Sequence, residues 1–194
     1  MIKSRKELFY YLEQDRLAYG KRGGVCHIFP DNNYLFVRTL RHLEYWYNKR
    51  RRGSRAIRLF VKMIEFIYIK RLSRLRALTG IELWVNVAGP GLHVSHGKIV
   101  VSASAQLGAH CKILSDVTIG GQGRYDVPGA PVIGNRVFIG SGARIIGPVT
   151  IADDVVIGAN AVVIHDVLEP GITVAGNPAR KVSNNGSYHF LNRR

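Results

Sequence analysis

The sequence is poor in cysteine and in acidic residues. Its 194 residues include two cysteines, Cys26 and Cys111, which cannot supply a disulfide framework or a zinc ribbon, so we expect a reducing compartment. Only 13 residues are acidic, against 28 Lys and Arg. Because 46% of the residues are hydrophobic, the chain can nevertheless bury a proper core and is not a disordered tail.

Long apolar runs are also missing. The most apolar stretch, AIRLFVKMIEFIYIK, is interrupted by Arg58, Lys62 and Glu65 and is too short to span a bilayer. The first residues, MIKSRKELFYYLEQDR, are charged from position 3 and lack the apolar centre of a signal peptide. We therefore expect a cytoplasmic protein.

Residues 1–80 carry the signals of helices. The segment SRKELFYYLEQDR opens with Ser4 and has Glu7 three positions later, which is the capping-box pattern. Residues 34–52 and 54–78 follow on either side of Gly53, and in the second segment apolar residues recur at spacings of three and four. The sequence thus predicts an α-helical region over residues 1–80.

From about Ile81 the hydrophobic period changes to six. Aliphatic residues recur at every sixth position in two runs, and a second row of small or aliphatic residues lies two positions before them. The gap between the runs is 14 residues, or six plus eight, which indicates one eight-residue excursion within GGQGRYDVPGAP. The first run is Val101, Leu107, Ile113 and Ile119, and the second is Ile133, Ile139, Ile145, Ile151, Ile157 and Val163.

A period of six predicts short strands joined by tight corners. Three such hexads make a triangular coil of about 18 residues, and stacked coils bury their aliphatic residues and pair as parallel sheets. Glycines beside the first row, such as Gly108 and Gly134, suit corners that need unusual dihedrals or close approach. We predict a mainly β protein, with a basic α-helical region at 1–80, a β-helix at 81–183 and a basic tail at 184–194.

These hexads, of the type [Leu/Ile/Val]-Gly-x-x-[Ala/Val]-x, resemble those of the hexapeptide-repeat acyltransferases. GPGLHVSHGK and the ending VIHDVLEPGITVAGNPARKVS resemble the serine acetyltransferase branch more narrowly. The resemblance covers roughly residues 80–183. It implies a left-handed parallel β-helix, a homotrimer, and acetyl-CoA as co-substrate in a groove between neighbouring subunits.

Transfer of an acetyl group to a hydroxyl requires a base, and a neutral imidazole is the usual one. The resemblance places the catalytic histidine at His96, through the matching pattern of Pro90, Gly91 and Leu92 before it. It also implies that Glu82 orients this imidazole, with Asp116 as a weaker alternative. His93 is either a substrate contact or a solvated residue of the coil.

The resemblance implies a site for CoA on the later coils and the C-terminal segment. The matching positions are Ser141, Ala159, Arg180 and Lys181, and the two cations would meet phosphate groups. The excursion contains Arg124, Tyr125 and Asp126. We predict that it forms a flap over the site, the alternative being an inert surface insertion.

The chain departs from the serine acetyltransferase pattern in two places. Ser95 stands where the family has an aspartate before the catalytic histidine, and the excursion lacks the family's Arg-His pair. We therefore predict that the acceptor is a sugar hydroxyl of a cell-surface polysaccharide or its precursor. The alternative acceptor is serine itself, in cysteine biosynthesis.

The positive charge is concentrated in residues 1–80, which carry 19 Lys and Arg against 6 Asp and Glu. This excess fits a polyanionic glycan or peripheral binding to the anionic inner face of a membrane, and it also fits a merely solvated helical face. No motif indicates nucleic-acid binding. The spacings of the histidines are not multiples of 18, so we expect no metal. A non-catalytic scaffold stays open as a further alternative.

Overall fold

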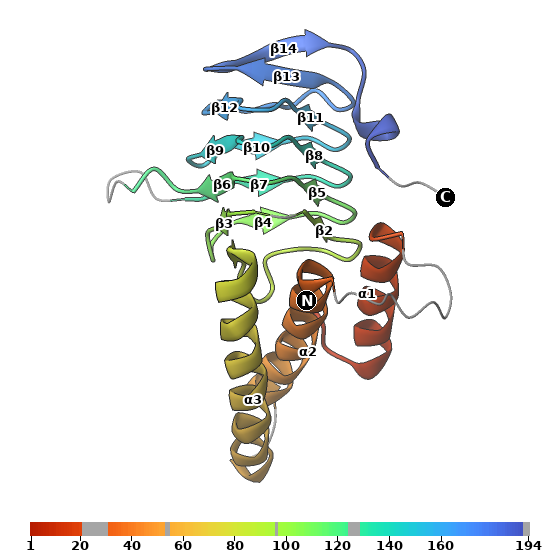
Figure 1. The fold of residues 1–194 in the computed structure, drawn as a ribbon, viewed down its shortest axis with the longest axis vertical. Helices are drawn as coiled ribbons and strands as arrows, with labels where there is room; N and C mark the ends of the chain where they lie inside the picture. Colours follow the sequence, from red (N-terminus) through yellow and green to blue (C-terminus); the bar gives the residue numbers. More distant parts are fainter. Residues whose placement is uncertain (21–30, 53–54, 96, 124–128, 192–194) are drawn as a thin grey trace.

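Three helices precede a parallel β-helix in the computed structural model, which describes residues 1–20, 31–52, 55–95, 97–123 and 129–191 (Figure 1). The helices are α1 (Arg5–Ala18), α2 (Asn32–Arg52) and α3 (Arg55–Thr79). They gather at the end of the β-helix that the chain enters first. The predicted order of elements is therefore confirmed.

Local sequence explains where α1 begins. The backbone N–H of Glu7 donates to Ser4 Oγ at 3.1 Å, and the Ser4 N–H donates to Glu7 Oε2 at 2.9 Å, so the predicted capping box forms. The helices α2 and α3 pack along each other, with the His42 and Tyr68 rings stacked at 5.4 Å. Within the described parts of the chain, no helix is long and apolar enough to cross a bilayer.

The strands of the β-helix are two to five residues long and follow one another at short corners (Figure 1). Their bounds are β1 Ile81–Glu82, β2 His93–Val94, β3 Ile99–Val101, β4 Gln106–Leu107, β5 Lys112–Ile113, β6 Val117–Gly120, β7 Val132–Ile133, β8 Phe138–Ile139, β9 Arg144–Ile146, β10 Thr150–Ile151, β11 Val156–Ile157, β12 Val162–Val163, β13 Thr173–Gly176 and β14 Ala179–Ser183. A short 3-10 helix, Ser187–His189, follows.

The strands form three sheets, one for each side of the coil. Sheet A has the order β1-β3-β6-β9-β12, sheet B has β10-β7-β4, and sheet C has β2-β5-β8-β11-β13, closed by β14. All pairs are parallel except β13 with β14, which is antiparallel.

The register confirms the 18-residue coil. Ile99 pairs with Val117, and Val132 pairs with Thr150, each a difference of 18. Lys112 pairs with Phe138 across the excursion, a difference of 26, which is 18 plus the predicted eight.

The interior of the coil consists of the two rows of residues that the sequence predicts. Every residue of the ladder with a spacing of six is at most 5% exposed. The residues of the second row, from Ala105 and Cys111 to Val155 and Ala161, are also at most 5% exposed. Cys111 belongs to this second row, and burial raises the pKa of its thiol to about 12. The excursion therefore interrupts the chain without disturbing the packing of aliphatic side chains between coils.

Except for Gly120, the glycines beside the ladder serve close approach and not unusual dihedrals. A Cβ at Gly108 would lie 2.6 Å from the carbonyl carbon of Gly134, in the next coil. Positive φ angles occur instead at other corner residues, including His110 at 58° and Arg136 at 56°. These glycines are needed because the backbones of stacked corners nearly touch.

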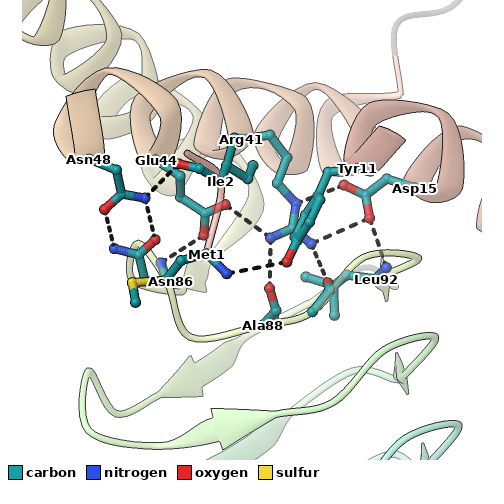
Figure 2. Close-up of polar contacts among 11 residues, drawn as sticks. Met1, Ile2, Tyr11, Asp15, Arg41, Glu44, Asn48, Asn86, Ala88 and Leu92 are labelled. Atoms are coloured by element: carbon teal, nitrogen blue, oxygen red, sulfur yellow. Dashed lines mark hydrogen bonds and ion pairs between the residues drawn. The ribbon is translucent and has the colours of Figure 1, made fainter. Parts of the chain in front are cut away.

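A buried ion cluster joins the helices to the first turn of the β-helix (Figure 2). Arg41 on α2 is fully buried, and its Nε donates to Asp15 Oδ2 at 2.8 Å while its Nη1 donates to Glu44 Oε2 at 3.1 Å. Although burial alone would lower the pKa of this guanidinium, the two carboxylates raise it above its ordinary value. Arg41 is therefore permanently charged and paired.

The same cluster forms hydrogen bonds with backbone groups of the first coil, which has no preceding coil to pair with. Arg41 donates to the carbonyls of Ala88 and Gly89 at 2.8 and 2.6 Å. Asp15 accepts the N–H of Leu92 at 2.8 Å, and Glu44 accepts the N–H of Asn86 at 2.7 Å. Because an open sheet edge presents unpaired backbone groups, these side chains take the place of a preceding coil.

Candidate active site

One corner of the coil, where sheet C turns into sheet A, brings together two of the predicted CoA-binding residues, Ser141 and Ala159. Backbone hydrogen bonds stack this corner from coil to coil: Ser95 N–H donates to Ile113 O at 2.8 Å, and Gly140 N–H donates to Ile157 O at 2.8 Å. Residues 95, 97, 114–116, 140–142 and 158–160 succeed one another along it. We call this line of residues the C–A corner.

Ser141 and Ala159 are neighbours on the C–A corner. The N–H of Asn160 donates to Ser141 O at 2.8 Å, and a Cβ at Gly140 would lie 2.7 Å from the nitrogen of Ala159. The structure adds Ser115, whose Oγ donates to Ser141 Oγ at 3.2 Å from the coil below. Sequence reasoning missed Ser115, although subtracting 18 plus the eight extra residues from 141 leads to it.

Arg180 and Lys181 lie on β14, at the last coil. Arg180 pairs with Ala175 of β13. The Cβ of Ala175 would lie 2.9 Å from a Cβ built at Gly158, which belongs to the C–A corner. The Arg180 side chain is exposed, and its Nη1 donates to the carbonyl of Ala179 at 3.0 Å. Lys181 Nζ forms an exposed ion pair with Glu169 at 2.6 Å. These cations therefore flank the end of the C–A corner.

The residue predicted to be the catalytic base, His96, lies outside the described residues. Its neighbours Ser95 and Gly97 both lie at the C–A corner, and a Cβ at Gly97 would be 2.9 Å from Ser115 Cβ. The predicted role of His96 stays a prediction.

Two carboxylates are candidates to orient the base. Glu82 is exposed on β1, beside Val100 of β3, and no hydrogen bond joins its carboxylate to another described residue. Asp116 is engaged already, since its Oδ2 lies 3.1 Å from Nη2 of Arg144. Of the two, Glu82 is the carboxylate that remains available, and its role too stays a prediction.

His93 is neither free nor simply solvated. Its ring stacks on Tyr19 with centroids 4.4 Å apart, and Nδ1 donates to the carbonyl of Ala18 at 3.0 Å. The Tyr19 hydroxyl in turn donates to Val94 O at 2.9 Å. His93 therefore attaches the end of α1 to β2, and contact with a substrate is a prediction that the structure does not test.

The excursion leaves the coil at a different corner, between sheets A and B. Arg124, Tyr125 and Asp126 lie outside the described residues, so the predicted flap stays a prediction. Its described flanks are held to the coil, because Gly147 N–H donates to Gly120 O at 2.9 Å. Across the described ranges, no group of three or more His, Cys, Asp or Glu side chains could hold a metal ion.

Comparisons with known proteins agree with this architecture. Residues 130–165 match the family described as bacterial transferase hexapeptide (six repeats). The serine acetyltransferase of Helicobacter pylori (strain ATCC 700392 / 26695) is 40% identical over 122 residues, which are 61% of this chain and 71% of that protein. The enzyme of the same name from Synechococcus elongatus is 37% identical over 120 residues, 61% of this chain and 48% of that protein.

Solved structures of serine acetyltransferases are similar to this chain over most of its length. Soybean serine acetyltransferase, as the apoenzyme, has a TM-score of 0.70 and 27% identity, and the match covers 91% of this chain and 69% of that one. The serine acetyltransferase from Neisseria gonorrhoeae in complex with serine has a TM-score of 0.70 and 27% identity, and the match covers 93% of this chain and 71% of that one.

The repeat, the three-sided coil and these likenesses define an acyltransferase of the hexapeptide-repeat class, built on a left-handed parallel β-helix. The handedness is opposite to that of ordinary β-α-β crossovers. Within that class the chain belongs to the serine acetyltransferase family and is an O-acetyltransferase.

The prediction of a sugar acceptor is wrong. The relatives and solved structures above are serine acetyltransferases, which favours the alternative acceptor, and nothing supports a role in polysaccharide synthesis. The prediction relied on two missing groups, the aspartate replaced by Ser95 and the Arg-His pair of the excursion. Missing side chains are weak evidence about an acceptor, because other positions can supply the groups that bind it.

Proposed function

We propose that this chain transfers the acetyl group of acetyl-CoA to the side-chain hydroxyl of serine. The observation that carries the proposal is the 40% identity over 122 residues with a serine acetyltransferase of which the chain covers 71%. The described corner geometry is consistent with it, since the residues flanking His96 share one line with Ser141 and Ala159.

In the proposed reaction, His96 acts as the general base. Its neutral imidazole takes the proton of the serine hydroxyl while the oxygen attacks the thioester carbonyl carbon. A tetrahedral intermediate forms and its carbon–sulfur bond breaks. The CoA sulfur then leaves as the thiol, with the proton that the imidazolium returns. Backbone N–H groups of the corner are the proposed donors to the developing oxyanion.

Glu82 is the proposed orienting group for the imidazole. A carboxylate at one ring nitrogen fixes the tautomer that leaves the other nitrogen free to accept a proton, and it stabilises the imidazolium. Glu82 is exposed on sheet A, in the coil below Val100, and its carboxylate is available for this contact.

We infer that CoA lies along the C–A corner. Ser141 and Ala159 would contact its pantetheine arm, and Arg180 and Lys181 at the end of the line would contact its phosphates. A homotrimer would complete this groove with a second copy of the chain. Arg124 and Asp126 of the excursion, with Tyr125 between them, carry charges that complement the carboxylate and ammonium groups of serine.

We retain the division at residues 80 and 183 as a proposal. It coincides with the end of α3 at Thr79 and with the end of β14 at Ser183. Apolar residues of α2 and α3 and those of the coils nevertheless belong to one continuous core, so the helical region is proposed to fold together with the β-helix.

The test is the release of CoA thiol from acetyl-CoA with L-serine as acceptor, with L-alanine as the matched acceptor that lacks the hydroxyl. We expect serine-dependent release, and we expect His96→Ala to lower kcat by about a hundredfold or more. Unchanged kcat in that variant would contradict the role of His96. Equal release with serine and alanine would contradict the proposed acceptor.

A further inference from the structure

The helix α3 exposes an apolar face that no described element covers. Leu59, Phe60, Met63, Phe66 and Ile67 are each between 59% and 75% exposed. Single apolar residues on a surface are ordinary, but five large ones on two turns of a helix form a patch of the kind that marks an interaction site.

Helix geometry places these side chains together. The spacings of three and four between Leu59, Met63 and Phe66, and between Phe60, Met63 and Ile67, put them on one side of the helix. The other side packs against the rest of the protein through Val61, Leu72 and other buried residues. The patch is therefore separate from the face that holds α3 in the fold.

The charged residues on the exposed side of α3 all have the same sign. Lys62, Lys70, Arg71 and Arg74 are exposed. The acidic residue of α3, Glu65, is buried and pairs with Arg50 at 2.9 Å. Among the described residues of α3, no carboxylate reaches the exposed side to neutralise these cations.

We propose that this surface binds an anionic lipid bilayer, with α3 lying in the plane of the interface. We call it the α3 outer face and define it by Leu59, Phe60, Met63, Phe66, Ile67, Lys62, Lys70, Arg71 and Arg74. Large apolar side chains flanked by Lys and Arg are the composition that holds a helix at the boundary between headgroups and acyl chains. Cations near such a surface are attracted to the phosphates of its lipids.

The position of α3 leaves room for a flat surface. In Figure 1 the N-terminal half of α3 projects away from the β-helix, at the end opposite to β13 and β14. A bilayer could meet it there while the C–A corner remains in water. The absence of a membrane-spanning helix among the described residues is compatible with binding at the surface only.

A two-fold interface between copies of the chain fits this face less well than a lipid surface does. A two-fold interface would place the α3 outer face against itself. The four exposed cations would then meet the same cations, without a described carboxylate of α3 to pair with them. Charge complementarity therefore favours an anionic partner.

The test uses the full chain and vesicles, with co-sedimentation as the readout. Vesicles of phosphatidylglycerol and phosphatidylcholine at 30:70 should bind the protein at low salt, and pure phosphatidylcholine vesicles should bind at least about tenfold less. Salt at about 0.5 M should weaken binding by screening. Lys70→Gln/Arg71→Gln/Arg74→Gln should lower affinity about a hundredfold, since each of the three cations contributes about fivefold.

A second pair of variants tests the apolar part. Phe66→Gln/Ile67→Gln should abolish vesicle binding, while Leu168→Gln, an equally exposed apolar residue beyond β12, should bind as the unchanged protein does. Circular dichroism checks that each variant keeps its fold. Failure to bind the phosphatidylglycerol vesicles would overturn the proposal. So would an oligomer that Phe66→Gln/Ile67→Gln dissociates in the absence of lipid, since the face would then be an interface between copies.

Discussion

The β-helix and the helical region satisfy buried backbone groups in different ways. Within the β-helix each coil pairs with the next through parallel strands, and the same two rows of aliphatic residues fill every turn. At the open end no coil is present, and side chains of Asp15, Arg41 and Glu44 pair with the backbone instead. A repeating structure is thus stabilised by many similar contacts, and its end by a few charged ones.

The first and largest predicted effect tests the charged end. Arg41→Met should lower the free energy of unfolding by about 3–5 kcal/mol, because it leaves two buried carboxylates without their cation. Denaturant unfolding measures it. The control is Arg144→Met in the coil, whose ion pair with Asp116 is exposed and should contribute about 1 kcal/mol or less. Equal losses in the two variants would contradict the distinction between end and coil.

The second prediction tests the stacking of corners. Gly108→Ala should lower the free energy of unfolding by about 1–3 kcal/mol, because the new Cβ would meet the backbone of Gly134. Gly120→Ala is the matched variant, since no described atom lies within 4 Å of its Cβ. It should change stability by about 0.5 kcal/mol or less. A Gly108→Ala protein as stable as Gly120→Ala would show that the corners can move apart.

The smallest effect concerns pH and lies between α2 and α3. Burial, with Arg38 and Arg71 nearby, lowers the pKa of His42 below its ordinary value of 6.5. The unfolded chain then binds the proton more readily, so this contribution to stability is present above pH 6.5 and is lost as the pH falls below it. His42→Gln should remove that part of the slope in unfolding curves between pH 7 and 5. An unchanged slope would contradict the assignment.

The coil could be predicted because its signal repeats. The period of six, its interruption by eight residues and the second buried row all follow from residues 99–163, and the register confirms each of them. The capping box at Ser4 and Glu7 is likewise local in sequence.

The attachment of the helices could not be predicted in this way. Asp15 and Leu92 are 77 positions apart, and Arg41 and Ala88 are 47 apart, without a period to connect them. Charged residues on a basic helix normally indicate a solvated face, yet Arg41 is fully buried. His93 also gave no local signal of its contact with Tyr19.

The candidate site was predictable only through the resemblance. Ser141 and Ala159 are 18 positions apart, so the coil alone places them at one corner, but the period does not indicate what binds there. The acceptor was predicted wrongly, because the argument used side chains that are missing and not side chains that are present.

The most direct test of the central claim, that the C–A corner is where this acyltransferase holds CoA, is hydrogen exchange with and without CoA. The account predicts slower exchange of the amides at 141–142 and 159–160, and unchanged exchange in α2 and α3. Unchanged exchange along the corner, with protection elsewhere on the molecule, would contradict it.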